Sequence, residues 1–145
     1  MRRTTYSFLD LGGAVAHPAL GAYTFSGQGV GKVTVAMATE RTVHDVAADG
    51  SVMVSKIAGE NGTVTIEAQQ TSDVHKWLLA AYNAIKVADI SAWAQMAMTL
   101  RNTSGGTSHI ITGISFQKVP DKPYDKQGQM VSWVLMAADI QSITA

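Results

Sequence analysis

Residues 72–88, SDVHKWLLAAYNAIKVA, decide the fold, because they form the one segment with a clear helical period. Thr71 and Ser72 offer oxygen atoms that can cap the first turn, and Asp73 places a carboxylate at the positive end of the helix dipole. Apolar residues recur at spacings of three and four, which places them along one stripe of a helix. The members of this stripe are Val74, Trp77, Leu78, Ala81, Tyr82 and Ile85. The polar residues fall on the opposite side and are predicted to face outward: His75, Lys76, Asn83 and Lys86.

The sequence on both sides of this helix predicts strands. Before it, residues 32–38 and 63–68 alternate between apolar and polar side chains. Residues 42–47 and 51–57 flank an Asp49-Gly50 turn, which is a hairpin signal. After the helix, strands are expected at residues 94–101, 108–119 and 130–140.

The last predicted strand is apolar on both faces, which indicates that both faces are covered. Val131, Trp133, Leu135 and Ala137 alternate with Met130, Val134, Met136 and Ile140. These elements predict a mainly β fold, an antiparallel sandwich or barrel with one flanking helix, in a single domain over residues 1–145. Residues 12–31 are rich in glycine and contain Pro18, so we expect a loop or flexible arm there, with weak strands around residues 14–16 and 22–25.

The composition shows few charges. The formal net charge of the 145 residues is zero, and charged residues make up 15% of the chain against a usual value of about 25%. Two explanations of the low charge content are equally good. The sequence is simply rich in alanine and glycine, or much of its surface is covered by other subunits. The absence of cysteine excludes disulfides and thiolate metal sites. No apolar run is long enough to span a membrane, and the N-terminal residues do not resemble a signal peptide, so we expect cytoplasmic synthesis without membrane insertion.

No motif predicts catalysis. The segment SGQGVGK at residues 26–32 has Ser26 where a phosphate-binding loop needs glycine, and Val33 where it needs serine or threonine. The four histidines are not spaced as metal ligands, and Ser115 lacks the second glycine of a nucleophile elbow. Basic residues do not cluster with aromatic ones, which argues against specific nucleic-acid binding. We therefore expect no cofactor, no metal and no enzymatic activity.

The order of short motifs resembles a known family. YSFLD at residues 6–10 is followed by Asp49-Gly50, GTVTI at 62–66 and TSDVHKWLLAAYN at 71–83. Trp93 then precedes FQKVPDKPY at 116–124, Gly128 and Trp133. This order is similar to that of structural proteins of contractile-tailed bacteriophages and prophages, which resemble tail tube proteins.

The resemblance implies two packed sheets with one flanking helix, assembled as hexameric rings that stack into the inner tube of a tail. The tube would conduct DNA without holding it, inside a virion tail assembled in the bacterial host cytoplasm. The implied partners are further copies of the chain, a tail sheath protein, a tape-measure protein, and baseplate and terminator proteins. Ring closure would also remove exposed sheet edges. The face with Thr34, Ala36 and Ala38 would suit the lumen, and ordinary solvent exposure explains it equally well.

The expected subunit interface combines the second apolar face of the last strand with two loops. Its candidate residues are Val131, Trp133, Val134, Met136, Gly27, Gly29, Asp49 and Gly50. Two alternative functions stay open. The chain would also suit the tube of a related contractile injection system or a phage-tail-like bacteriocin. From a different class, it would suit a small-ligand-binding β-barrel.

Overall fold

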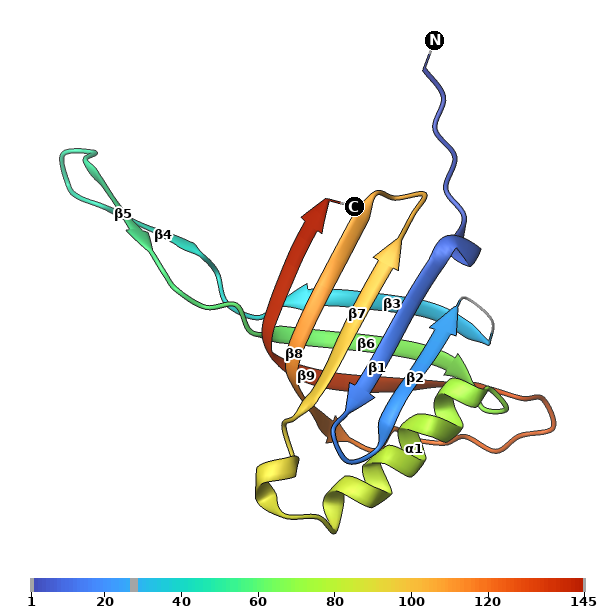
Figure 1. Ribbon diagram of the computed structural model, residues 1–145. Coiled ribbons are helices and arrows are strands. Elements are labelled where there is room, and N and C mark those ends of the chain that lie inside the picture. Colours follow the sequence, from blue (N-terminus) through green and yellow to red (C-terminus); the bar gives the residue numbers. More distant parts are fainter. Residues whose placement is uncertain (1, 27–28, 145) are drawn as a thin grey trace.

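A computed structural model of the chain describes residues 2–26 and 29–144. Within these residues, seven strands form one antiparallel sheet in the order β2-β1-β7-β8-β9-β6-β3 (Figure 1). The mainly β class with one flanking helix is therefore confirmed. The sheet strands are β1 (Leu11–His17), β2 (Gly21–Ser26), β3 (Val30–Met37), β6 (Gly62–Gln69), β7 (Met96–Asn102), β8 (Thr107–Lys118) and β9 (Met130–Thr144). The other elements are the hairpin β4 (Thr42–Val46) and β5 (Val52–Lys56), the helix α1 (Asp73–Lys86), and the 3-10 turns η1 (Phe8–Asp10) and η2 (Ile90–Ala92).

The long strand β9 folds the sheet over on itself. Its residues 130–137 pair with β6, and its residues 134–144 pair with β8. In Figure 1, β3, β6 and the first half of β9 form one layer, and β2, β1, β7 and β8 cross it as a second layer. The apolar faces of both layers meet in one core, so a single bent sheet makes the predicted sandwich.

The first half of β9 supplies the centre of this core. Its inward residues Val131, Trp133, Leu135 and Ala137 are at most 4% exposed. The indole of Trp133 packs edge-on against Phe116 of β8, with ring centroids 5.6 Å apart, and Phe116 packs edge-on against Tyr82 of α1. This chain of rings links both layers to the helix.

The helix α1 covers the open side of the folded sheet (Figure 1). The hydroxyl of its N-cap residue Ser72 accepts a hydrogen bond from the backbone N–H of His75. In the stripe, Val74, Leu78, Ala81 and Ile85 are buried, while Trp77 and Tyr82 are half-buried. Trp77 stacks on Tyr23 of β2, with ring centroids 5.7 Å apart.

The prediction that His75 faces outward is wrong. Its side chain is 7% exposed, and its Nδ1 accepts a hydrogen bond of 3.0 Å from Nε1–H of Trp133. A buried indole N–H needs an acceptor, and the first turn of α1 passes directly over it. Burial lowers the pKa of His75, and the positive charge of Lys122 adds to this effect.

The expectation of a loop or flexible arm at residues 12–31 is also wrong for most of that stretch. Residues 12–17 of β1 pair in unbroken register with residues 21–26 of β2, where we expected only weak strands. Gly13 is required by packing, because a Cβ atom there would lie 2.6 Å from Cζ of Phe25. At position 13, glycine therefore allows close ring-to-backbone contact inside a sheet.

A bulge at Gly113 keeps the inner face of β8 continuous. Ile114 pairs with Met96, but Ile111 pairs with Met98, so two residues of β8 lie opposite Ala97. The φ angle of Gly113 is +66°, and a Cβ atom there would lie 2.6 Å from Cβ of Ala138. Because of this extra residue, Ile111 and Ile114 are both 0% exposed.

We predict that Gly113→Ala lowers the free energy of unfolding by roughly 2 kcal/mol or more, since it adds backbone strain and a clash. The measurement is urea unfolding followed by tryptophan fluorescence. Gly12→Ala is the matched control, because Gly12 is also in the sheet but a Cβ atom there would meet nothing within 4 Å. Equal unfolding midpoints for the two variants would contradict the role of the bulge.

A second prediction concerns the stability of the fold at acid pH. Because the pKa of His75 is lowered in the folded chain, the unfolded chain binds a proton near pH 6.5 while the folded chain does not. Stability is therefore complete above about pH 6.5 and falls as the pH decreases below it, by at most about 1.4 kcal/mol per pH unit for this group. Burial lowers the pKa of His109 as well, so His109 contributes in the same direction.

We expect His75→Gln to reduce the slope of unfolding free energy against pH between 7 and 5, measured by urea unfolding at each pH. His44→Gln is the control, because His44 lies on the exposed hairpin strand β4. The slope is compared, and not the absolute stability, because the glutamine variant also alters packing. An unchanged slope in His75→Gln would show that this histidine does not couple protonation to folding.

Candidate subunit interface

The hairpin β4–β5 projects away from the folded sheet (Figure 1). Every residue of both strands is exposed. In the antiparallel register Val46 pairs with Val52 and His44 pairs with Val54, so these four side chains share one face. Val46, Val52 and Val54 are 64%, 51% and 62% exposed. An apolar hairpin face without a covering layer indicates a contact with another molecule.

The turn of this hairpin is built by local hydrogen bonds. The Asp49 carboxylate accepts from the backbone N–H of Ser51 at 2.9 Å, and this contact lowers the pKa of Asp49. Gly50 has a φ angle of +89°, and its N–H donates to the Ala47 carbonyl at 3.0 Å. The candidate interface residues Asp49 and Gly50 thus shape the exposed tip.

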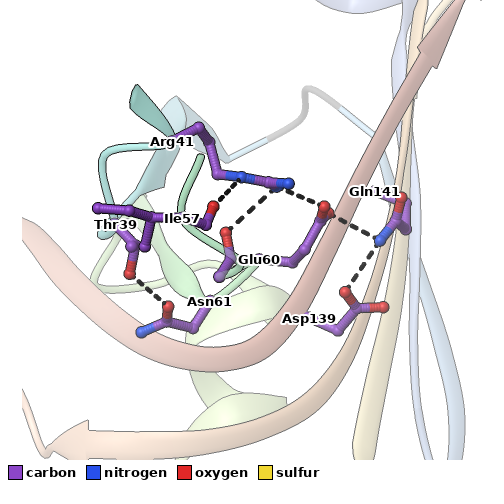
Figure 2. Close-up of polar contacts among 8 residues, drawn as sticks. Thr39, Arg41, Ile57, Glu60, Asn61, Asp139 and Gln141 are labelled. Carbon is purple, nitrogen blue, oxygen red and sulfur yellow. Dashed lines mark hydrogen bonds and ion pairs between the residues drawn. The ribbon is translucent and has the colours of Figure 1, made fainter. Parts of the chain in front are cut away.

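Polar contacts fix the base of the hairpin to β9 (Figure 2). The Arg41 guanidinium donates to the Ile57 carbonyl at 2.7 Å and to the Glu60 carboxylate at 2.6 Å. The other carboxylate oxygen of Glu60 accepts from Gln141 at 2.8 Å, and Gln141 also donates to Asp139. The backbone N–H of Ile140 donates to the Glu60 carbonyl at 2.8 Å. Since Arg41 and Glu60 are both over a third exposed, these contacts set the direction of the hairpin more than they stabilise the fold.

Several stretches of strand have a strand partner on one side only, and three of them belong to β2, β3 and β9. β2 pairs with β1 alone, β3 pairs with β6 alone, and residues 138–144 of β9 pair with β8 alone among the described strands. Such edges carry backbone groups that can pair with a neighbouring copy. On β3 the small residues Thr34 and Ala36 are exposed, as is Ala38 beyond the strand.

The structure does not bring the predicted interface residues together. Val131 and Trp133 are 1% and 0% exposed, so their assignment to a subunit interface is wrong: the bend in β9 places them inside the core. Val134 is half-buried and Met136 is 46% exposed, both on the outer face of β9.

The two candidate glycines have different outcomes. Gly27 lies outside the described residues. Gly29 has a φ angle of +74°, and a Cβ atom there would lie 2.8 Å from Cβ of Ser72, so it packs inside the subunit.

One exposed apolar surface was missed from the sequence. Val87, Ile90 and Trp93 follow the end of α1 and are 79%, 90% and 36% exposed. They are three residues apart, which is a helical spacing, but the predicted stripe of the helix ends at Ile85 and was not continued to Ile90 and Trp93. Ile90 and Trp93 line a hollow together with Lys86 and Asp89.

Neither a metal site nor a ligand cavity between the layers is found among the described residues. Among them, no three His, Asp or Glu side chains gather as metal ligands. The space between the layers is occupied by packed apolar side chains of the core, which disfavours the small-ligand-binding barrel. No helix in the described part of the chain has the length and apolar character needed to cross a membrane.

Comparison with known sequences gives one family. The bacteriophage PhiTE tail tube protein family matches residues 3–145. No curated protein matches the sequence significantly.

Solved structures show the same fold at low sequence identity. A chain of the anti-feeding prophage cap is 9% identical with a TM-score of 0.63, and the match covers 100% of this chain and 95% of that one. A chain of the anti-feeding prophage baseplate is also 9% identical with a TM-score of 0.63, over 99% and 98%. A chain of the sheath–tube complex of the PVC extracellular contractile injection system is 9% identical with a TM-score of 0.56, over 92% and 88%.

We predict that Arg41→Ala loosens the hairpin without unfolding the sheet. The expected result is faster hydrogen exchange of the β4 and β5 amides, with a loss of unfolding free energy of at most about 1 kcal/mol. Lys56→Ala is the control, because it removes a positive charge from the same hairpin and the Lys56 side chain makes no hydrogen bond among the described residues. Equal exchange rates in the two variants would show that Arg41 does not orient the hairpin.

Proposed function

The chain belongs to the bacteriophage PhiTE tail tube protein family, and from that premise we propose that it is the repeating subunit of the inner tube of a contractile tail. The subunits assemble into hexameric rings, and the rings stack into a conduit for DNA. The observation that carries this proposal beyond family membership is the projecting hairpin, whose apolar face is exposed in the described part of the subunit.

The free edges of the sheet support a ring. An edge on one side of a subunit that pairs with a different edge of the next copy makes a heterologous contact, which closes into a ring when its rotation closes. Closure also protects strand edges that would otherwise favour aggregation. A ring of six is supported by the six-fold symmetry of the anti-feeding prophage baseplate that contains a similar chain.

A charge-poor wall suits a conduit. On the outer side of β2, β1, β7 and β8, one row of neighbours in register is Thr24, Ala14, Thr99 and Ile110. On the outer side of β3, Lys32 lies opposite Glu67 of β6, which balances its charge. Phosphate contacts with cations are what hold DNA, so a lumen lined by either face would let DNA pass.

The proposed partners follow from the complexes that contain similar chains. Those complexes hold a sheath, a tube terminator and a baseplate. We therefore propose that this tube meets a tail sheath protein along its length, a terminator at one end and a baseplate at the other, with a tape-measure protein setting its length. Its location is the virion tail, assembled in the bacterial host cytoplasm. The likeness to injection-system chains favours a second candidate, the tube of such a machine or of a phage-tail-like bacteriocin.

The test is electron microscopy of the purified protein and of a variant without the hairpin. In the variant, Asn-Gly replaces residues 44–54 and joins Val43 to Ser55, which already face each other across the hairpin. The wild-type chain is expected to form rings or tubes at high concentration. The shortened chain is expected to stay folded by circular dichroism and to form none.

Two outcomes count against the proposal in different ways. A wild-type chain that is strictly monomeric at high concentration, even beside its tail partners, would defeat the tube function. Tubes from the shortened chain would leave the function intact but remove the hairpin from assembly.

A further inference from the structure

Two buried histidines connect the helical part of the chain to the sheet. His75, in the first turn of α1, contacts Trp133 in the half of β9 that pairs with β6. His17, the last residue of β1, contacts Ala92 of the turn η2, which follows α1. Since this half of β9 and β1 belong to different layers in Figure 1, each layer is joined to the segment of residues 72–93 by one histidine.

The partners of each ring determine which nitrogen carries its proton. Nδ1 of His17 lies 3.1 Å from the Ala19 backbone N–H, and its Nε2 lies 2.9 Å from the Ala92 carbonyl. An N–H only donates and a carbonyl only accepts, so the neutral ring has its proton on Nε2. Nδ1 of His75 accepts from the indole N–H of Trp133 at 3.0 Å, so this ring also has its proton on Nε2. Both contacts need an Nδ1 without a proton.

A protonated ring carries N–H groups on both nitrogens, and it cannot make these contacts. In His75 the new Nδ1–H would point at the indole N–H of Trp133. The indole is fully buried, so the loss of its acceptor leaves a buried donor unsatisfied, which is costly. In His17 the new Nδ1–H would point at the Ala19 N–H, and a rotation of the ring that relieves this conflict also breaks the bond to Ala92.

The other two histidines do not face a fixed donor in this way. Nδ1 of His109 lies 2.7 Å from the hydroxyl oxygen of Ser142. A hydroxyl both donates and accepts, so it can turn to accept from a protonated ring. His44 lies on the exposed hairpin strand β4, where water can solvate both forms. The conflict between protonation and hydrogen bonding therefore concerns His17 and His75.

The charges around the two rings do not favour protonation. In the described part of the chain, neither ring forms an ion pair with a carboxylate. Burial, and then the positive charge of Lys122 in the loop before β9, lowers the pKa of His75. The titratable groups on the elements around the rings are Tyr23, Asp73, Lys76, Lys86, Asp89 and Lys122, and of these only Tyr23 and Lys122 are half-buried.

We propose that His75 and His17 form an acid-sensitive latch, which fixes residues 72–93 to both layers of the sheet when the rings are neutral and releases the two ends of this segment when they are protonated. The inference goes beyond the tube function and does not depend on it, because every group of the latch belongs to one subunit. The backbone hydrogen bonds of the sheet do not titrate in this range, so the opening is local.

The direction of the pH effect follows from the proton binding of the two forms. In the open form His75 is solvated and binds a proton near pH 6.5, whereas burial keeps its pKa lower in the closed form. The latch is therefore closed above about pH 6.5. Below this pH, the equilibrium constant for opening rises by up to about tenfold per pH unit for each ring that takes up a proton.

The test is hydrogen exchange of the full chain, followed by mass spectrometry between about pH 7.5 and about pH 5. Exchange rates are corrected for the intrinsic effect of pH on amide exchange. Below about pH 6.5, we expect the protection of peptides from residues 72–93 to fall by up to about tenfold per pH unit for each ring. Peptides from β6 should keep their protection. Constant protection of residues 72–93, or a loss in step with that of β6, would overturn the proposal.

Asparagine variants assign the effect to the two rings. In His75→Asn and His17→Asn, the side-chain oxygen lies near the former position of Nδ1 and accepts from an N–H, but it does not titrate. The double variant is expected to exchange faster at every pH, with protection of residues 72–93 that no longer depends on pH.

His109→Asn is the matched control, because it removes a histidine whose pKa is also lowered by burial but whose hydroxyl partner can reverse its role. It should keep the pH dependence of the wild-type chain. An unchanged pH dependence in a folded double variant would overturn the proposal. If the double variant does not fold, each single variant is compared with the wild-type chain, and a full wild-type pH dependence in both would overturn it.

Discussion

The hydrogen bond between Trp133 and His75 connects the helix α1 to β9, the strand that is shared by the two layers of the sheet. Trp133 sits in the half of β9 that pairs with β6, and the same strand continues into the half that pairs with β8. Its indole is fully buried, so its N–H would cost about 1–3 kcal/mol if it had no acceptor. His75 supplies that acceptor from α1. One contact thus holds the helix over the point at which the sheet turns from one layer into the next.

The apolar core is buried within the subunit, but several large apolar side chains on the surface are exposed. The bend in β9 lets one sheet close over its own apolar face, and α1 covers the side that stays open. In the described part of the chain, the valine face of the hairpin and the side chain of Ile90 are exposed, and the edge strands β2 and β3 each have one strand partner. The low charge of the chain agrees with the proposal that neighbouring copies cover part of this surface.

The sequence predicted the elements that depend on local periodicity. The helix, the hairpin around Asp49-Gly50 and the long last strand all have repeating patterns that short-range physics determines. The predicted orientation of His75 was wrong because its partner Trp133 is 58 residues away in the sequence. A local sequence pattern cannot predict a contact between residues that far apart. The strands β1 and β2 were underestimated because the role of Gly13 appears only when the ring of Phe25 is placed against it.

The interface was predictable in part for the same reason. Asp49 and Gly50 lie at an exposed tip, as the turn signal between two strands predicted, and their part in a subunit interface stays a prediction. Val131 and Trp133 were misassigned because a strand that is apolar on both faces does not show which face its own subunit covers. The hollow lined by Ile90 and Trp93 was not predicted, because those residues lie beyond the periodic stripe of the helix and only the placement of η2 beside the end of α1 brings them to Ile85 and Lys86.

The small size of the hairpin has an energetic consequence for assembly. A five-residue strand pair buries too little area to hold two subunits by itself once the loss of rotational and translational freedom is counted. Several copies in one ring would present their hairpins together, so the contacts with the next ring act as linked sites at high effective concentration. Lateral closure of a ring and its stacking on the next ring are then coupled. Subunits that have not closed into a ring would bind the growing end only weakly.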